Sequence, residues 1–274
     1  RKGRALPAAK SRFVSGEPSP DGHRIRYLIA QVKGSCLQLT NEQQLLAQED
    51  VGGAHELVLV DNRSTDGSLA IARRYPDVVL LEEPVPGAYA ARNTGIRRAR
   101  APILAFTDAD CVADRRWLRS ILDGMADPSV AVLVGQCLYP PEASRLLHLL
   151  GAWENAKAEH VLGLSESAHR FAWANNMAVR ASVFAEIGLF EEWKRAADSE
   201  LVHRLAARRP DLRAAFRRSM KVTHLEFLRA RDRARRLRLY TQTNARIPTF
   251  RELGAAARLA VLARLVLGRR GRSE

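Results

Sequence analysis

The sequence predicts an α/β fold in which a mostly parallel central sheet carries helices on both faces. Short apolar runs at residues 56–60, 78–82 and 101–107 alternate with segments of helical character, and polar, acidic turns follow two of them. Alternation of this kind is typical of parallel sheets whose strands are joined by helices. At 274 residues the chain is long enough to bury the core of one such domain.

The predicted elements follow one another in a regular order, each set by hydrophobic periodicity and by turn or capping residues. In chain order we expect a strand within residues 26–35, a helix from 42, a strand over 56–60, a helix over 68–75, a strand over 78–82, a buried strand over 101–107 and a helix start within 111–118.

Asp108 and Asp110 directly follow the buried run 101–107. Because side chains alternate along an extended chain, we expect the two carboxylates to point the same way and to repel each other unless a cation lies between them. The carboxyl ends of strands are also where α/β sheets bind ligands. A hard divalent cation with a nucleoside diphosphate fits such a site. The alternative for so common a spacing is a solvated turn.

Three blocks of the sequence carry a family resemblance. They are VDNRSTDG at 60–67, AARNTG at 90–95 and FTDADC at 106–111. In order and spacing they resemble the family 2 glycosyltransferases, and the likeness extends from about Leu45 to about Leu225. It includes the segments 173–180, 198–205 and 222–224. The resemblance implies a GT-A type fold and an inverting, hexosyltransferase-like enzyme that uses a nucleotide-sugar donor.

The resemblance also implies a metal site. Asp110 would bind the ion directly, Asp108 would contact the ribose or reach the metal through water, and His224 would add a further ligand. Carboxylates with water and phosphate oxygens favour Mg²⁺ or Mn²⁺, so one of these is the expected cofactor. For His224 the alternative is an ordinary core or surface histidine.

Two further residues would bind the nucleotide sugar. By resemblance, Asp61 would accept a hydrogen bond from the base, and Arg92 would lie near the diphosphate or the base as a bidentate donor. Helix capping is the alternative for Asp61, although Asp66 suits that position better. For Arg92 the alternative is a solvated helix arginine.

Inversion by single displacement needs a general base that takes the proton of the acceptor hydroxyl. The resemblance places this base at Asp198, with Glu200 as the weaker candidate. The acid that relatives carry immediately before the base is replaced by Ala197. Acidic residues that merely stabilise a helix N-terminus are the alternative.

The first strand departs from the family pattern. Residues 26–35 lack the proline and the polar turn that relatives use to hold the base. Either backbone groups hold the base here or the site is damaged. A non-catalytic nucleotide- or glycan-binding relative therefore stands as the alternative to an enzyme.

Composition narrows the remaining classes of protein. A net charge of +14 suits nucleic acid, an anionic membrane or anionic substrates, but the chain has no nucleic-acid-binding motif, so a basic nucleic-acid-binding protein is less favoured and no nucleic acid is expected. Cys36, Cys111 and Cys137 show no disulfide or zinc-ligand spacing and are expected to be reduced thiols.

Three regions are expected along the chain. They are a disordered basic arm at 1–22, a GT-A catalytic domain at 23–225 and a basic, partly amphipathic helical region at 226–274. No apolar stretch is long enough to span a bilayer, so we expect a cytoplasmic protein. Within 249–268, Leu259, Leu262 and Val266 recur at helical spacing beside arginines.

Such a helix predicts peripheral contact with the anionic inner face of the membrane. Packing of the same apolar stripe on the catalytic domain is the alternative. The expected acceptor is a glycan, a lipid-linked molecule or a small molecule.

Overall fold

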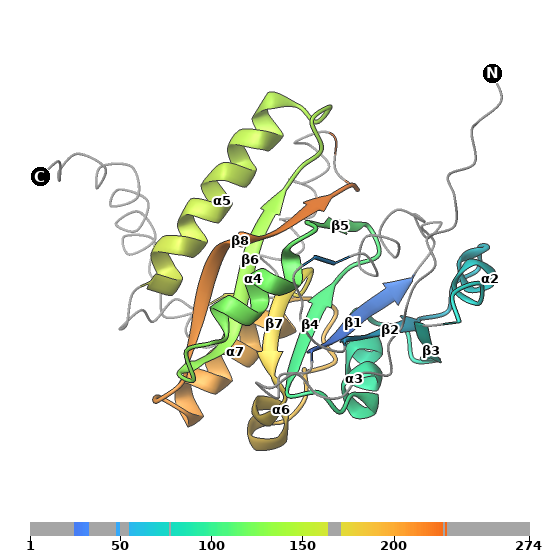
Figure 1. Cartoon of the computed structure of the whole chain (residues 1–274), viewed down its shortest axis with the longest axis horizontal. Coiled ribbons are helices and arrows are strands. Elements are labelled where there is room, and N and C mark those ends of the chain that lie inside the picture. The colour runs from blue at the N-terminus through green and yellow to red at the C-terminus, as the bar shows by residue number, and fades with distance from the viewer. Residues whose placement is uncertain are drawn as a thin grey trace, which may run out of the picture.

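The computed structural model describes residues 25–32, 48–49, 55–76, 78–163, 171–226 and 228. Within these ranges the chain forms an eight-stranded sheet flanked by helices (Figure 1). The strands are β1 (Ile25–Val32), β2 (His55–Asp61), β3 (Val78–Glu82), β4 (Ile103–Thr107), β5 (Cys111–Ala113), β6 (Val130–Leu138), β7 (Asn176–Arg180) and β8 (Arg213–His224). The helices are α2 (Ser68–Ala72), α3 (Ala88–Arg98), α4 (Trp117–Gly124), α5 (Arg145–Gly163), α6 (Ala181–Ile187) and α7 (Ala197–Arg208).

The sheet has two halves of different topology. Its strand order is β3-β2-β1-β4-β7-β6-β8-β5. The first four strands in this order are mutually parallel and form what we call the parallel half. In the mixed half, β7 runs antiparallel to β4 and β6, β8 runs parallel to β6, and β5 runs antiparallel to β8. The four strands that the sequence predicts are all present.

Helices cover both faces of the sheet, as predicted. Along β2, Val58 and Val60 pack in one buried cluster with side chains of α3, α6 and α7. Leu57 and Leu59 belong to a second cluster, which contains side chains of α2 and α4. Figure 1 shows α4 in front of the sheet and α7 behind it. Alternating side chains on a strand buried on both sides produce these two cores.

Asn176 ties β7 to the elements around it. Its buried amide donates to the carbonyls of Gln136 and Met220, both at 2.9 Å, and accepts from the indole nitrogen of Trp117 at 2.7 Å. A Cβ at Gly135 would lie 2.3 Å from the Asn176 amide nitrogen, so only glycine fits there. These bonds fix the position of β8, which carries His224.

One strand of the sheet was not predicted. The helix start expected within residues 111–118 is confirmed, since α4 begins at Trp117, but Cys111–Ala113 before it form the additional strand β5. The physical reason is the antiparallel pairing of β5 with the end of β8, a partner that lies far away in the sequence.

Other predictions extend beyond the described residues. The helix from 42, the arm at 1–22 and the C-terminal region after 228 lie outside these ranges. Within the part of the chain that the structure describes, every helix is too short or too polar to cross a bilayer.

Candidate active site

The carboxyl edge of the parallel half carries two of the predicted site residues. Asp61 ends β2, Asp108 follows β4, and β1 lies between these strands. Ile29 of β1 pairs with both Leu59 and Thr107, so β2 and β4 end at nearly the same level. Two strand spacings separate β2 from β4, about 10 Å. That is a suitable span for a nucleoside lying across the edge.

Asp61 has one carboxylate oxygen that no described residue contacts by a hydrogen bond. Its Oδ2 accepts the Ser64 N–H at 3.3 Å, whereas its Oδ1 is buried and has no hydrogen-bond partner among the described residues. At the start of α2 it is Asp66, not Asp61, that accepts the N–H of Ser68, at 3.0 Å. A buried acceptor without a donor is costly unless a ligand supplies one.

Asn62 holds the turn after β2 against the loop that leads into α3. Its amide donates to the carbonyls of Glu83 at 2.8 Å and Val85 at 2.6 Å, and it accepts the Gly87 N–H at 2.8 Å. This network sets where α3 begins and hence where Arg92 lies. Sequence reasoning gave Asn62 no role, because its partners become visible only in the fold.

Arg92 is buried, so the alternative of a solvated helix arginine is wrong. Its Nη2 donates to Asp108 Oδ1 at 2.6 Å, and its guanidinium carbon lies 5.1 Å from the centroid of the Tyr89 ring. Burial opposes the charge, but Asp108, Tyr89 and Asp198 together raise the pKa of Arg92. Arg92 therefore connects Asp108, which follows β4, with Asp198 on α7.

Asp108 and Asp110 do not lie on an extended strand. β4 ends at Thr107, and the Cys111 N–H donates to the Asp108 carbonyl at 3.0 Å, which closes a turn over the two acids. The two carboxylates therefore do not point the same way through strand alternation, as the sequence had led us to expect. Asp108 pairs with Arg92, while Asp110 Oδ2 lies 3.9 Å from His224 Nδ1.

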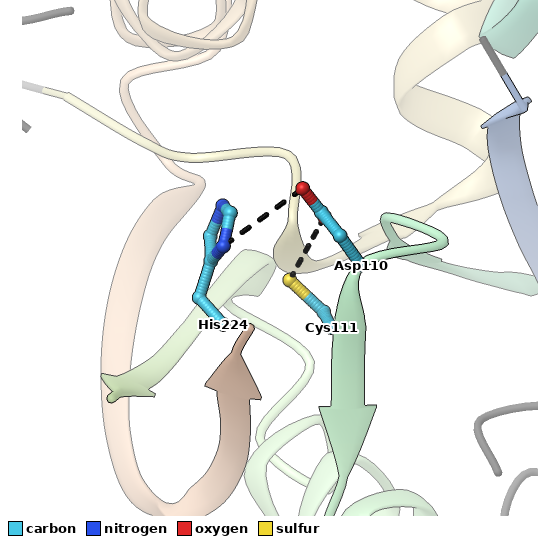
Figure 2. Close-up of side chains that lie close together, drawn as sticks. All are labelled: Asp110, Cys111 and His224. Carbon is cyan, nitrogen blue, oxygen red and sulfur yellow. Dashed lines mark hydrogen bonds and ion pairs between the residues drawn. The ribbon is translucent and has the colours of Figure 1, made fainter. Parts of the chain in front are cut away.

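Asp110, Cys111 and His224 form a compact cluster in the mixed half (Figure 2). One ligand atom of each lies within 4.8 Å of the others. Cys111 pairs directly with His224 across β5 and β8, and the Leu225 N–H donates to the Asp110 carbonyl at 2.8 Å. His224 is thus buried beside a carboxylate, and the oxygen, nitrogen and sulfur donors fit a divalent cation.

Cys111 was missed as a member of this cluster. The sequence showed no metal-ligand spacing for cysteine, because the partner strand β8 comes much later in the chain. Burial raises the pKa of the Cys111 thiol well above its ordinary value, and the Asp110 and Asp108 carboxylates add to this effect. In the structure as it stands, the thiol is therefore protonated.

Asp198 lies in the first turn of α7 and is buried. Its Oδ2 accepts the Ala174 N–H and its Oδ1 accepts the Ser199 N–H, both at 2.9 Å. Burial raises the pKa of Asp198, against the opposing effects of the Ala174 hydrogen bond and of Arg92. Asp198 is consequently a stronger base than a solvent-exposed aspartate.

Glu200 is bound in an ion pair. It accepts two hydrogen bonds from Arg204, at 3.0 and 2.8 Å, and Arg204 also donates to the carbonyls of Ile187 and Leu189. Glu200 thus links α7 to the end of α6 and the loop after it. Ala197, at the position of the missing acid, is fully buried in the core.

The chain is similar to proteins of one family. The model of the family described as "Glycosyl transferase family 2" matches residues 43–188. Glycosyltransferase AglE from Haloferax volcanii is 30% identical over 142 residues, which are 50% of this chain and 45% of that protein. Validoxylamine A glucosyltransferase from Streptomyces hygroscopicus subsp. limoneus is 35% identical over 105 residues, or 36% and 22% of the two chains. The chain thus spans less than half of either relative.

A solved structure shows the same fold. The mannosyltransferase PcManGT from Pyrobaculum calidifontis, in complex with GDP-Man and Mn²⁺, is similar with a TM-score of 0.63 at 22% identity. The match covers 92% of this chain and 73% of that one. This likeness confirms the expected GT-A type fold.

Proposed function

The chain belongs to glycosyl transferase family 2, and we propose that it transfers a sugar from a nucleoside-diphosphate sugar to an acceptor hydroxyl with inversion. The observation that carries this proposal is the position of Arg92. Its guanidinium donates a hydrogen bond to Asp108 at the carboxyl edge of the parallel half and acts electrostatically on Asp198. The proposed donor site and the proposed general base would therefore belong to one active site.

The base of the donor would bind at Asp61. The buried Asp61 Oδ1, which has no protein donor among the described residues, would accept a ring N–H of the base. A charge-assisted hydrogen bond of this kind contributes about 1.5–3 kcal/mol. Backbone groups at the end of β1 would supply further contacts, which is why that strand needs no particular side chains.

Asp110 and His224 would hold a divalent cation, with Mn²⁺ or Mg²⁺ as the proposed ion. Bound there, the ion would stabilise the negative charge that develops on the departing diphosphate. Asp108 is already paired with Arg92, so it would contact the ribose or reach the metal through a water molecule.

Asp198 would act as the general base. The acceptor oxygen attacks the anomeric carbon while its proton passes to the Asp198 carboxylate. The bond from the anomeric carbon to the phosphate oxygen breaks, and the nucleoside diphosphate leaves on the opposite side. The new glycosidic bond therefore has the inverted configuration. Because the pKa of Asp198 is raised, it lies closer to neutral pH than the pKa of an ordinary aspartate does, as suits a general base.

Turnover with a panel of nucleotide sugars tests this function. With Mn²⁺ present we expect one donor to be consumed, and the product to have the inverted anomeric configuration by NMR. Calorimetry should show that a chelator weakens nucleoside-diphosphate binding. Equal affinity with and without chelator would refute the metal site.

A second candidate is a non-catalytic relative that binds nucleotide or glycan. The observation that favours it is the buried Ala197 at the position of an acid. Tight, metal-dependent binding of nucleotide sugars without turnover of any donor would establish this alternative.

We also propose that α5 contacts an anionic membrane surface. Leu146, Leu149 and Trp153 are exposed by 58%, 67% and 41%, and their spacing places them on one side of the helix. The Lys157 ammonium lies 4.7 Å from the Trp153 ring centroid. Apolar side chains beside lysine on a protein of net charge +14 suit anionic lipid, and such contact would bring the site to a lipid-linked acceptor.

Liposome co-sedimentation tests the membrane contact. We expect binding to anionic but not to neutral vesicles, and weaker binding at high salt. Leu149→Glu should reduce it, whereas Val85→Glu, at another exposed apolar residue, should not. Truncation after Ile247 measures how much of the vesicle binding depends on residues 248–274. Equal sedimentation of Leu149→Glu and the unchanged chain would contradict the role of α5.

A further inference from the structure

We propose that Cys111 is a third ligand of the cation site and makes it selective for Zn²⁺ and similar ions over Mg²⁺ and Mn²⁺. The inference rests on the proposed function in one respect, the use of Asp110 and His224 as ligands. It goes beyond that function because a thiolate changes which ions the site retains.

The geometry allows one ion to reach all three residues. Cys111 Sγ lies 3.8 Å from Asp110 Oδ1, and His224 Nδ1 lies 3.9 Å from Asp110 Oδ2. Ligand atoms of a tetrahedral zinc ion, with bonds of 2.0–2.3 Å, lie about 3.3–3.8 Å from one another. Small side-chain rotations therefore suffice to close the site around an ion (Figure 2).

The backbone keeps the ligands in place. Cys111 lies opposite His224 in the antiparallel pair of β5 and β8, so their side chains are neighbours on one face of the sheet. Cys111 is fully buried and His224 nearly so. Asp110 precedes Cys111 directly, and its carbonyl is bonded to the Leu225 N–H just beyond β8. The three ligands are thus largely preorganised before an ion enters.

The donor atoms decide the selectivity. Imidazole and thiolate favour Zn²⁺ and Co²⁺, whereas carboxylate with water favours Mg²⁺ and Mn²⁺. When an ion binds, the Cys111 thiol loses its proton to solvent, because a coordinating thiol is deprotonated by the metal. A serine at this position would leave only oxygen and nitrogen donors. Cys111 therefore raises affinity for softer ions with little effect on Mn²⁺.

Titration with metal ions alone tests the proposal, without nucleotide. Co²⁺ should produce a thiolate-to-metal charge-transfer absorption in the unchanged chain and in Cys137→Ser, but not in Cys111→Ser. Cys137 is the matched control, since its Sγ bonds the Asn175 side chain at 3.5 Å and lies outside the three-residue cluster. By calorimetry, Cys111→Ser should lower the affinity for Zn²⁺ by at least about tenfold and change the affinity for Mn²⁺ by less than about threefold.

The outcomes separate this proposal from the proposed function. If Co²⁺ gives no charge-transfer absorption in the unchanged chain, or if Cys111→Ser binds Zn²⁺ as tightly, the role of Cys111 is overturned. If Mn²⁺ still supports nucleoside-diphosphate binding in that case, the proposed function stands. If no divalent ion strengthens nucleoside-diphosphate binding either, the proposed metal site is refuted as well. The absorption of the unchanged chain needs no variant, so a misfolded Cys111→Ser cannot obscure the result.

Discussion

The two halves of the sheet assemble their site residues in different ways. In the parallel half, Asp61 and Asp108 lie at the ends of strands, where the topology puts them at one edge. In the mixed half, Asp110 and Cys111 meet His224 only because a strand of three residues, β5, pairs with the end of β8. The site residues of the parallel half are placed by the ends of their own strands, whereas those of the mixed half are brought together by one long-range strand pairing.

The halves also differ in their charges. In the parallel half, Asp108 is already paired with the buried Arg92. In the mixed half, Asp110 faces an imidazole and a protonated thiol. We therefore expect the metal cation to bind in the mixed half, and the following variants test that difference.

Asp110→Asn should have the largest effect. It removes the only carboxylate of the Asp110–Cys111–His224 cluster, so we expect turnover to fall by about 1,000-fold. Mn²⁺ should also no longer strengthen nucleoside-diphosphate binding. Asp114→Asn is the control, since Asp114 is exposed and its side chain accepts the Arg116 N–H, a bond that asparagine can also accept. Metal-dependent binding that survives in Asp110→Asn would move the metal site to the parallel half.

Asp198→Asn should lower kcat by about 100- to 10,000-fold while donor affinity is kept, because the base acts only on the acceptor. An asparagine still accepts the Ala174 N–H. Glu200→Gln should keep most activity but lower the melting temperature, since Glu200 is bound to Arg204. The assignment would be reversed if Glu200→Gln were inactive and Asp198→Asn active.

The pH dependence follows from the raised pKa of Asp198. The folded state holds this proton more tightly than the unfolded state does. The resulting stability is present below the ordinary carboxyl pKa and is lost as pH rises through the raised value. Denaturation at neutral pH should therefore find Asp198→Asn at least as stable as the unchanged chain, with the difference shrinking in acid. A growing advantage in acid would contradict the burial effect.

Arg92→Lys should have a smaller effect on donor binding. A lysine keeps the charge but cannot reproduce the directed bond to Asp108, so we expect donor affinity to fall by about tenfold. Arg92→Gln should also destabilise the fold by about 3 kcal/mol, because it leaves the partly buried Asp108 and the buried Asp198 without this cation. Titration by calorimetry and chemical denaturation measure the two effects. Unchanged affinity in both variants would separate Asp108 from the donor site.

The smallest expected effect concerns backbone conformation at the edge of the parallel half. Arg63 is exposed and has φ 62°, a left-handed conformation that favours glycine. Arg63→Gly should raise the free energy of unfolding by about 0.5–1 kcal/mol. Arg73→Gly is the control, since Arg73 has a right-handed helical backbone and glycine should lower stability there. Equal effects of both substitutions in denaturant would contradict the argument.

Much of the parallel half was predictable from local patterns. The runs 56–60, 78–82 and 101–107 predict strands that the structure contains, because alternation and length are local properties. The contact of Asp66 with the start of α2 was also predictable, because the two lie next to each other in the sequence.

The sequence by itself determined the fold class, the family resemblance and the acidic turns at the strand ends. Only the tertiary structure decided that Arg92 is buried, bonded to Asp108 and within electrostatic reach of Asp198, and that Cys111 lies beside His224. The physical reason is that periodicity and capping act within a few residues, whereas strand pairing and charge burial depend on the packing of the whole sheet. A thiol that looked inert in the sequence thus became a candidate metal ligand in the fold.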